Sequence, residues 1–249
     1  MKIIAFLAFV FVLLASKDGK AENVVMAFAL GAPPYTFTSE DDQKTKRDGI
    51  WIDIYREALA FRGHTLEPHF TNYNRVETKL KNGTITAVSL LQDRLPTLHA
   101  SENAIHFRNF AFEQPGGTAP VQSLADLAGR RLTTWLGART DLGEAFSKAV
   151  DTLSYYKEMP SQEAQIRFFV KRGIDFTIVD ETIFRYLVRK NGKNPDAYKA
   201  HDIVGGYLRF SAGFVSEKNR DDFNAGIRHL KETGRYDAIY RFYADTYVE

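Results

Sequence analysis

The end of a short apolar stretch carries the first side chains suited to binding chemistry. Residues 85–90 are apolar, small or β-branched, which predicts a buried strand. Ser89 supplies a hydroxyl on this strand, and Arg94 supplies a guanidinium just beyond it. A guanidinium presents a planar fork of donors that matches the two oxygens of a carboxylate. Ser89 and Arg94 are therefore candidates to hold a carboxylate, although an arginine in a solvated loop fits the local sequence as well.

A second candidate group lies at the end of another predicted strand. Residues 175–180 are mostly apolar and β-branched, and they end in the carboxylate of Asp180. Glu181 follows directly, but two neighbouring carboxylates at a strand end or in a first helical turn point apart. The pair therefore does not predict acid–base catalysis.

Other reactive patterns are missing from the sequence. The six histidines (64, 69, 99, 106, 201 and 229) include no pair at helical i, i+4 spacing with a third ligand nearby, so no metal site is predicted. There is no nucleophile elbow and no phosphate-binding loop. The absence of cysteine excludes disulfides, thiolate metal sites, a cysteine nucleophile and a lipid-modified cysteine. We expect no cofactor, no metal and no catalytic residue.

The N-terminus is typical of a secretory signal peptide. Lys2 is followed by an unbroken apolar run over 3–15, which is too short to span a bilayer comfortably. Small residues over 19–21 suggest a cut before Glu22, and Ala15 or Ser16 are alternative sites. Residues 1–21 are thus the expected signal peptide. We expect a periplasmic protein that is free of a lipid anchor.

The net charge and the amino-acid composition limit the classes of molecule that the protein is expected to bind. Of the 249 residues, 44% are hydrophobic and 26% are charged, as in a soluble globular protein of one large or two modest domains. Loss of residues 1–21 removes three lysines and one aspartate, which changes the net charge from +2 to zero. A chain without net positive charge lacks the basic surface that nucleic acid requires, so no nucleic-acid partner is expected.

The elements that must position these groups alternate along the chain. A strand over 24–29, a helix to residue 59, a strand over 65–70, a helix near 73–80 and the strand over 85–90 give a β-α-β-α-β order. Residues 98–112 show no single pattern. Tyr35 follows two prolines after the first strand, where it either lines a pocket or caps the core.

A second α/β run follows the Pro-Gly break at 115–117. Its expected elements are a short helix over 123–129, strands over 131–135, 155–159 and 175–180, and helices to 149, over 161–173 and over 181–190. A glycine pair at 205–206 precedes a strand over 210–216 and helices over 222–233 and 236–247. The order predicts an α/β protein.

Six segments are recognisable as a set: APPYTF at 32–37, DGIWIDI at 48–54, LKNG at 80–83, SLADLAGR at 123–130, GIDFTIVD at 173–180 and LKETGRYDAIY at 230–240. Together they resemble the extracellular solute-binding proteins of the polar amino-acid type, bacterial family 3. The resemblance covers nearly the whole chain after residue 21. Each segment is a weak motif, and their order and spacing carry the resemblance.

The resemblance implies a two-lobe, periplasmic-binding-protein-like (type II) fold with two hinge crossings, near 104–108 and 205–209. Lobe 1 would comprise residues 22–108 and 207–249, and lobe 2 residues 109–206. The family's carboxylate-binding arginine and companion hydroxyl fall on Arg94 and Ser89, and its ammonium-binding aspartate on Asp180. The backbone donors of its lobe 2 turn fall on the three consecutive residues Gly137, Ala138 and Arg139.

Three positions depart from the family pattern. Leu91 stands where a second hydroxyl is usual, Arg139 where threonine is usual, and Ala29 where a side-chain contact is usual. Arg139 either reaches an acidic group of the ligand or faces solvent. Tyr35, Trp51 and Trp135 are candidates to surround the ligand side chain.

The resemblance therefore implies a monomeric binding protein and not an enzyme. The expected ligand is a small amino acid or related zwitterion, held between two closing lobes and delivered to a membrane permease of the ABC type. Two alternatives remain open. One is a carbon–oxygen lyase like cyclohexadienyl dehydratase, with Glu181 and Arg139 as possible groups, and the other is a sensory protein that reports to a kinase or chemoreceptor.

Overall fold

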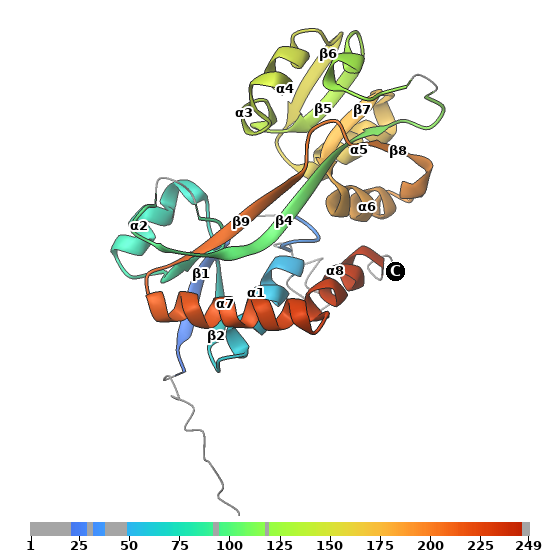
Figure 1. Cartoon of the computed structure of the whole chain (residues 1–249). Helices are drawn as coiled ribbons and strands as arrows, with labels where there is room; N and C mark the ends of the chain where they lie inside the picture. The colour runs from blue at the N-terminus through green and yellow to red at the C-terminus, as the bar shows by residue number, and fades with distance from the viewer. Residues whose placement is uncertain (1–20, 29–31, 38–48, 92–94, 118–119, 246–249) are drawn as a thin grey trace, which may run out of the picture.

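A computed structural model describes residues 21–28, 32–37, 49–91, 95–117 and 120–245. These residues form two α/β lobes joined by two long strands, β4 (His99–Glu113) and β9 (Tyr207–Phe214) (Figure 1). The strand order is β2-β1-β3-β9-β4-β7-β5-β6, and β8 pairs with β4 beside this path. The predicted α/β class is confirmed. The expected signal peptide lies almost wholly outside the described residues.

Lobe 1 is built on parallel strands with helices on its faces. β1 pairs in parallel with both β2 and β3, and β3 pairs with β9 in the antiparallel sense. Its other elements are β1 (Asn23–Phe28), α1 (Ile50–Ala60), β2 (Thr65–Phe70), a 3₁₀ turn (Tyr73–Arg75), α2 (Val76–Lys81), β3 (Ala87–Val88), α7 (Glu217–Glu232) and α8 (Arg235–Asp245). The strand expected over 85–90 is regular only over Ala87–Val88, although the N–H groups of Thr86 and Ser89 still donate to the Val25 and Ala27 carbonyls of β1.

Helix α7 packs closely on α1, and a glycine makes this possible. A Cβ atom on Gly226 would lie 2.0 Å from the carbonyl oxygen of Ala58, far inside van der Waals contact. On the same helix face, Phe223 and Ile227 are completely buried. The ring of Phe223 stacks edge-on against Tyr55 of α1, with the centroids 4.9 Å apart. The two helices are thereby in direct contact along this face of lobe 1.

Lobe 2 contains a parallel arrangement of β6, β5 and β7. Its elements are a 3₁₀ turn (Leu124–Leu127), β5 (Arg131–Trp135), α3 (Ala138–Asp141), α4 (Gly143–Val150), β6 (Tyr155–Met159), α5 (Gln162–Arg172), β7 (Phe176–Asp180), α6 (Glu181–Lys190), a 3₁₀ turn (Pro195–Ala197) and β8 (Lys199–His201). The helix expected to end at residue 149 is therefore split into α3 and α4, with Gly143 at a positive φ of 80° where α4 begins.

Strand β4 passes from one lobe to the other, so the stretch over 98–112 is a single strand and not a mixed segment. It pairs with β9 as far as Arg108 and with β7 from Asn109 onward. Its partner β9 begins immediately after Gly205 and Gly206, which both have positive φ. The two strands are the chain crossings between the lobes (Figure 1).

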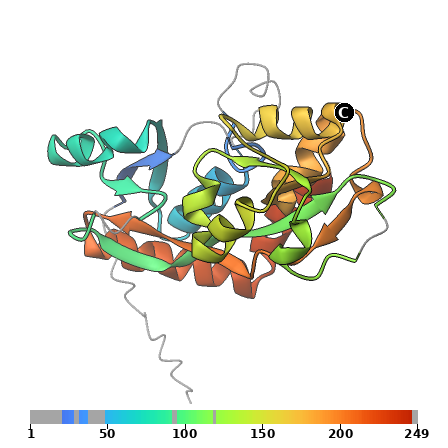
Figure 2. The same ribbon diagram turned by 90° about the horizontal axis from the view of Figure 1, so that it is seen from above.

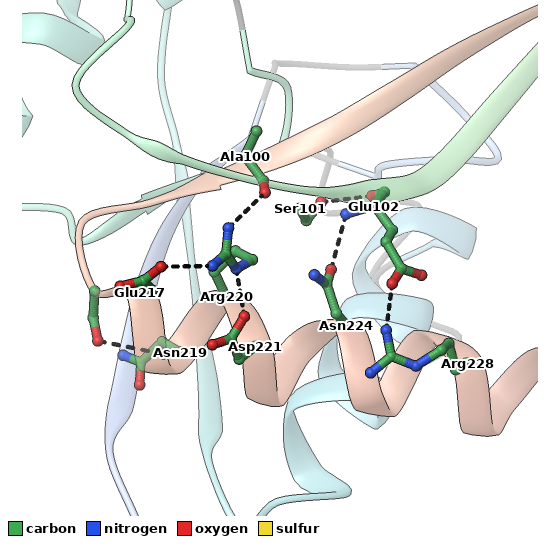
Figure 3. A network of polar contacts seen from close by, with 10 residues as sticks. Ala100, Ser101, Glu102, Glu217, Asn219, Arg220, Asp221, Asn224 and Arg228 are labelled. Atoms are coloured by element: carbon green, nitrogen blue, oxygen red, sulfur yellow. Dashed lines mark hydrogen bonds and ion pairs between the residues drawn. The ribbon is translucent and has the colours of Figure 1, made fainter.

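The first half of β4 is irregular, and α7 compensates for the irregularity. The pairing with β9 shifts register between Ala100 and Asn103, which leaves backbone groups without ladder partners. Side chains of α7 reach these groups: Arg220 Nη1 donates to the Ala100 carbonyl at 3.3 Å, and Asn224 Oδ1 accepts from the Glu102 N–H at 2.9 Å (Figure 3). Arg228 adds an ion pair with the Glu102 side chain. The strand is thereby held on lobe 1.

The lobes also contact each other behind the crossing strands. Helix α8 of lobe 1 contacts α6 of lobe 2, and the end of α8 lies beside lobe 2 in both ribbon views (Figures 1 and 2). The ring of Phe37 lies between Tyr186 of α6 and Tyr243 of α8, with centroid distances of 5.8 and 6.1 Å. The hydrophobic core on this side is shared by both lobes.

Candidate functional site

A cavity of about 400 Å³ opens where the crossing strands meet lobe 2. The crossing strands contribute aromatic, amide and aliphatic side chains, and lobe 2 contributes an indole, an amide and two carboxylates. The lining residues are Phe107 and Asn109 of β4, Leu208 and Phe210 of β9, and Trp135, Asp141, Gln162 and Asp180 of lobe 2. We call this cavity the cleft.

A second cavity, of about 520 Å³, lies beside β9. It is lined by Leu91, Leu95, Pro96, Leu98, Ala100, Arg209, Phe210 and Ser211. Among the described residues, none of the site residues predicted from the sequence is in this set, whereas Asp180 and Trp135 both line the cleft. The cleft is therefore the better candidate site despite its smaller volume.

Asp180 lies at the inner end of the cleft and is only 3% exposed. Its Oδ1 accepts from the Ile183 N–H at 3.1 Å and so caps α6, while Oδ2 accepts from the Arg108 N–H of β4 at 2.9 Å. Burial raises the pKa of Asp180 to about 6, against the opposing effect of these hydrogen bonds. The carboxylate thus caps α6, joins it to a crossing strand and faces the cleft.

Tyr35 approaches the same carboxylate from lobe 1. Its hydroxyl donates to Asp180 Oδ1 at 3.2 Å, and it also lies 3.4 Å from the His106 carbonyl oxygen. Its ring packs on Phe107, which lines the cleft, with the centroids 4.6 Å apart. Burial, followed by the neighbouring Asp180 charge, raises the pKa of Tyr35 well above its ordinary value. Tyr35 is therefore a protonated donor that supports the cleft from behind.

Trp135 and Asp141 form one wall of the cleft. The indole Nε1 donates to Asp141 Oδ2 at 2.8 Å, which fixes the orientation of the ring. Trp135 ends β5 and Asp141 lies in α3, so the turn between the two elements brings the side chains together. The sequence analysis did not identify Asp141, although its position six residues after the strand end, in the turn of helix that follows, is a usable signal.

The turn at the start of α3 already holds a carboxylate. Glu158 Oε2 accepts from the Gly137 N–H at 2.9 Å, and Oε1 accepts from the Arg139 N–H at 3.0 Å. Ala138 is completely buried between them. These are the backbone donors that the sequence analysis assigned to a ligand, and in this structure Glu158 occupies the first and last of them.

Arg139 points its side chain along α4. Its Nε donates to Ser147 Oγ at 2.9 Å, and Nη2 lies 3.2 Å from the Ser147 carbonyl oxygen. The same guanidinium forms an ion pair with Asp151 at 2.5 Å. Arg139 is not among the cleft-lining residues. Of the two roles considered for this side chain, the structure therefore favours a surface ion pair.

The remaining predicted residues lie on the lobe 1 side. Ser89 is buried just after β3, and its carbonyl accepts from the Tyr55 hydroxyl at 2.9 Å. Trp51 is 2% exposed in the core, edge-on to both Phe28 and Phe107. Trp51 therefore contacts the back of a cleft residue and does not itself line the cleft. Arg94 and Ala29 lie outside the described residues.

Most of the cleft lining was not predicted from the sequence. The residues missed are Phe107, Asn109, Asp141, Gln162, Leu208 and Phe210. Four of these six belong to the crossing strands, whose pairing is set by partners about a hundred residues away. For the four residues on the crossing strands, the sequence offered one signal, which was the pair of expected crossings near 104–108 and 205–209.

Two further classes of site were searched for in the described parts of the chain. No group of three or more potential metal ligands comes together there. Within the same residues, no helix combines the length and the apolar character that crossing a bilayer requires.

Solved structures share this fold at low sequence identity. An ancestral cationic amino acid solute-binding protein superposes with a TM-score of 0.73 at 14% identity, over 90% of this chain and 96% of that chain. The substrate-binding protein of a polar amino acid ABC uptake transporter from Streptococcus thermophilus gives a TM-score of 0.65 at 18% identity, over 89% and 85% of the two chains. A histidine kinase sensor domain similar to periplasmic binding proteins also gives 0.65 at 18% identity, over 90% and 96%.

The similarity confirms the predicted two-lobe, periplasmic-binding-protein-like fold. At these identities it establishes the fold alone. No protein-family model matches the chain, and no curated protein matches it by sequence.

Proposed function

We propose that this protein binds a small solute with an ammonium group, such as an amino acid or related zwitterion, in the cleft between its two lobes. One observation carries the proposal: Asp180 of lobe 2 faces a cavity lined by both crossing strands and is bonded to Tyr35 of lobe 1. A buried carboxylate at such a junction is a natural partner for a cationic group. The fold shared with amino-acid-binding proteins supports the same class of ligand.

The roles of individual residues follow from their positions. Asp180 would pair with the ammonium group, and Trp135 would lie along the body of the ligand from lobe 2. Tyr35 would support this arrangement through its bond to Asp180. For Arg94, together with Ser89, the proposed role as a carboxylate partner rests on the sequence alone. It is tested by Arg94→Ala and Arg94→Lys, which should both weaken amino-acid binding while the melting temperature stays unchanged.

The bound ligand would serve one of two biological roles, transport or signalling. The sequence of residues 1–21 and the resemblance to transporter proteins support a monomeric periplasmic protein that delivers its ligand to a membrane permease. A sensor role is supported by the similarity to a kinase sensor domain. The two roles would use the same cleft.

The dehydratase alternative receives less support from the site. A lyase of this kind needs a general acid and a cation positioned against the substrate. Arg139, the cation considered for this role, is bonded to Ser147 and Asp151 instead of lining the cleft. The fold is also that of an ancestral amino-acid-binding protein described as a precursor of cyclohexadienyl dehydratase, so turnover of prephenate and arogenate is a direct check.

The proposal is tested by a thermal-shift screen with amino acids and amines, followed by titration calorimetry. A ligand at a hundred times its Kd stabilises the folded state by about 2.7 kcal/mol. Asp180→Asn keeps an N-cap acceptor for α6 but removes the charge and turns its amide N–H groups toward the Arg108 N–H. Binding should weaken by roughly 2–5 kcal/mol, and circular dichroism checks that the variant is folded. Asp196→Asn, which removes an exposed carboxylate of lobe 2, is the matched control. Unchanged affinity in Asp180→Asn would reject the proposed site.

A further inference from the structure

The carboxylate of Glu158 occupies a site for an anion inside lobe 2. It accepts from the Gly137 and Arg139 N–H groups at 2.9 and 3.0 Å, and Oε1 also accepts from the Tyr156 hydroxyl at 2.9 Å. Tyr156 is held in turn by Thr134 at 2.9 Å. Glu158 thus has three donors on its two oxygens, which is a nearly complete set of partners.

The sheet of lobe 2 makes this arrangement a consequence of the fold. In the parallel pairing of β5 with β6, Thr134 lies opposite Glu158 and Trp135 lies opposite Met159. Glu158 therefore emerges beside the end of β5, directly under the turn that starts α3. No rearrangement of the backbone is needed to bring the carboxylate to these N–H groups.

The charge of Glu158 is stable in this position. Desolvation opposes ionisation, but the hydrogen bonds from Gly137, Arg139 and Tyr156 outweigh it and hold the pKa of Glu158 below its usual range. The group is therefore anionic at neutral pH. A ligand carboxylate that approached the same N–H groups would have to displace Glu158 and would meet a like charge.

The described lining of the cleft is also suited to a cation. It includes the carboxyl groups of Asp141 and Asp180, and none of its residues is a lysine, arginine or histidine. Three aromatic rings, those of Phe107, Trp135 and Phe210, also line it, and Asn109, Gln162 and Leu208 make up the rest. Aromatic faces attract cations through the ring quadrupole, most strongly for tryptophan.

We infer that the ligand is an organic amine that needs no carboxylate, and that Glu158 takes the place which a ligand carboxylate would occupy on lobe 2. The inference rests on the proposed binding of an ammonium solute in the cleft and narrows the class of that solute. The ammonium pairs with Asp180 in the closed cleft, and the aliphatic or aromatic body of the amine lies against Trp135 and Phe210.

Matched pairs of ligands test the inference, because a decarboxylated amine differs from its parent amino acid by the carboxylate alone. The probes are agmatine and arginine, cadaverine and lysine, and tyramine and tyrosine, each titrated calorimetrically into the wild-type full chain. In at least one pair, the amine should bind ten times more tightly than the amino acid, or better.

Variants then assign the preference to Glu158. Glu158→Gln removes the internal anion, so the preference for the amine should fall at least tenfold. Glu144→Gln changes an exposed glutamate of the same lobe, which pairs with Lys148 in α4, and should leave the preference unchanged. If Glu158→Gln does not fold, the inference is still tested by the affinities of the wild-type protein for each amine and its parent amino acid.

The outcomes separate this inference from the proposed function. The inference would be overturned if, in every pair that binds, the amino acid bound the wild-type protein more tightly than its amine. The proposed function would still stand in that case, provided that Asp180→Asn abolished the binding. If no probe of either kind binds, both fail together.

Discussion

The hydroxyl of Tyr35 donates to Oδ1 of Asp180 at 3.2 Å and thereby joins residues that are 145 positions apart in the chain. Tyr35 follows β1 in lobe 1, and Asp180 ends β7 in lobe 2. The N–H of Arg108, on the crossing strand between them, donates to the other oxygen of the same carboxylate at 2.9 Å. One buried carboxylate therefore connects both lobes and a crossing strand beside the cleft.

Removal of the Tyr35 hydroxyl should loosen this connection. Tyr35→Phe keeps the ring on Phe107 but deletes a donor to Asp180, so the free energy of unfolding should fall by about 1 kcal/mol. Because that donor favours the ionised carboxylate, the pKa of Asp180 should also rise above about 6. Chemical denaturation and the pH dependence of ligand affinity measure the two effects. Tyr155→Phe, at an exposed tyrosine of lobe 2, should show neither effect.

The affinity for a cationic ligand should depend on pH through Asp180. Its pKa is about 6, so the carboxylate is mostly ionised at pH 7.5 and becomes protonated as the pH falls. An alkylammonium ligand keeps its charge throughout this range. Affinity should therefore fall below pH 6, approaching tenfold for each further pH unit.

The neighbours of Asp180 define the control for the pH experiment. Burial raises the pKa of Tyr35 and of Tyr240, so both remain protonated between pH 5 and 8. Burial lowers the pKa of His106, whose carbonyl accepts from Tyr35, so His106 is the neighbour whose effect the control must separate from that of Asp180. In Asp180→Asn the fall in affinity near pH 6 should disappear, and its persistence would assign the effect to His106 instead.

Ligand binding should close the lobes, because the cleft lining is divided between the lobe 1 ends of the crossing strands, with Phe107 and Phe210, and lobe 2, with Trp135 and Asp180. A ligand shifts a conformational equilibrium only by its differential affinity for the two states, and contacts divided in this way provide the difference. Small-angle X-ray scattering should therefore show a smaller radius of gyration at saturation. An unchanged radius with a bound ligand would indicate a rigid pocket.

The close approach of α7 and α1 should make Gly226 intolerant of any side chain. A methyl group there would lie 2.0 Å from the Ala58 carbonyl oxygen, which belongs to helix backbone and cannot move without shifting α1. Gly226→Ala should therefore lower the free energy of unfolding by about 1–3 kcal/mol despite the higher helix propensity of alanine. Glu232→Ala, on the exposed face of the same helix, should have little effect. An equal stability of the two variants would contradict the packing described for α7.

Several elements could be predicted because their signals are local. Helix α5 begins after Ser161, whose Oγ accepts from the Ala164 N–H at 3.2 Å, and it ends at Gly173 with a φ of 61°. Both signals lie within one turn of the helix that they limit, so the sequence contains them completely. Strand β7 with Asp180 at its end was predictable for the same reason.

The long strand β4 was not predictable from local pattern. Its first half carries Glu102 and Asn103 where the pairing with β9 shifts register, so the alternation of polar and apolar residues is interrupted. The partners that satisfy this stretch are Arg220 and Asn224 of α7, more than a hundred residues later. A strand stabilised in this way has no complete signal in its own sequence.

The sequence by itself determined the α/β class, the order of the elements and the presence of Asp180 at a strand end, because these depend on residues close together in the chain. Only the tertiary structure decided what the Gly137 turn binds. Glu158 reaches it through the register of β5 with β6, which is set by packing and not by local sequence. The sequence does not reveal that the Gly137 turn already binds an internal carboxylate, because Glu158 lies 21 positions away on another strand.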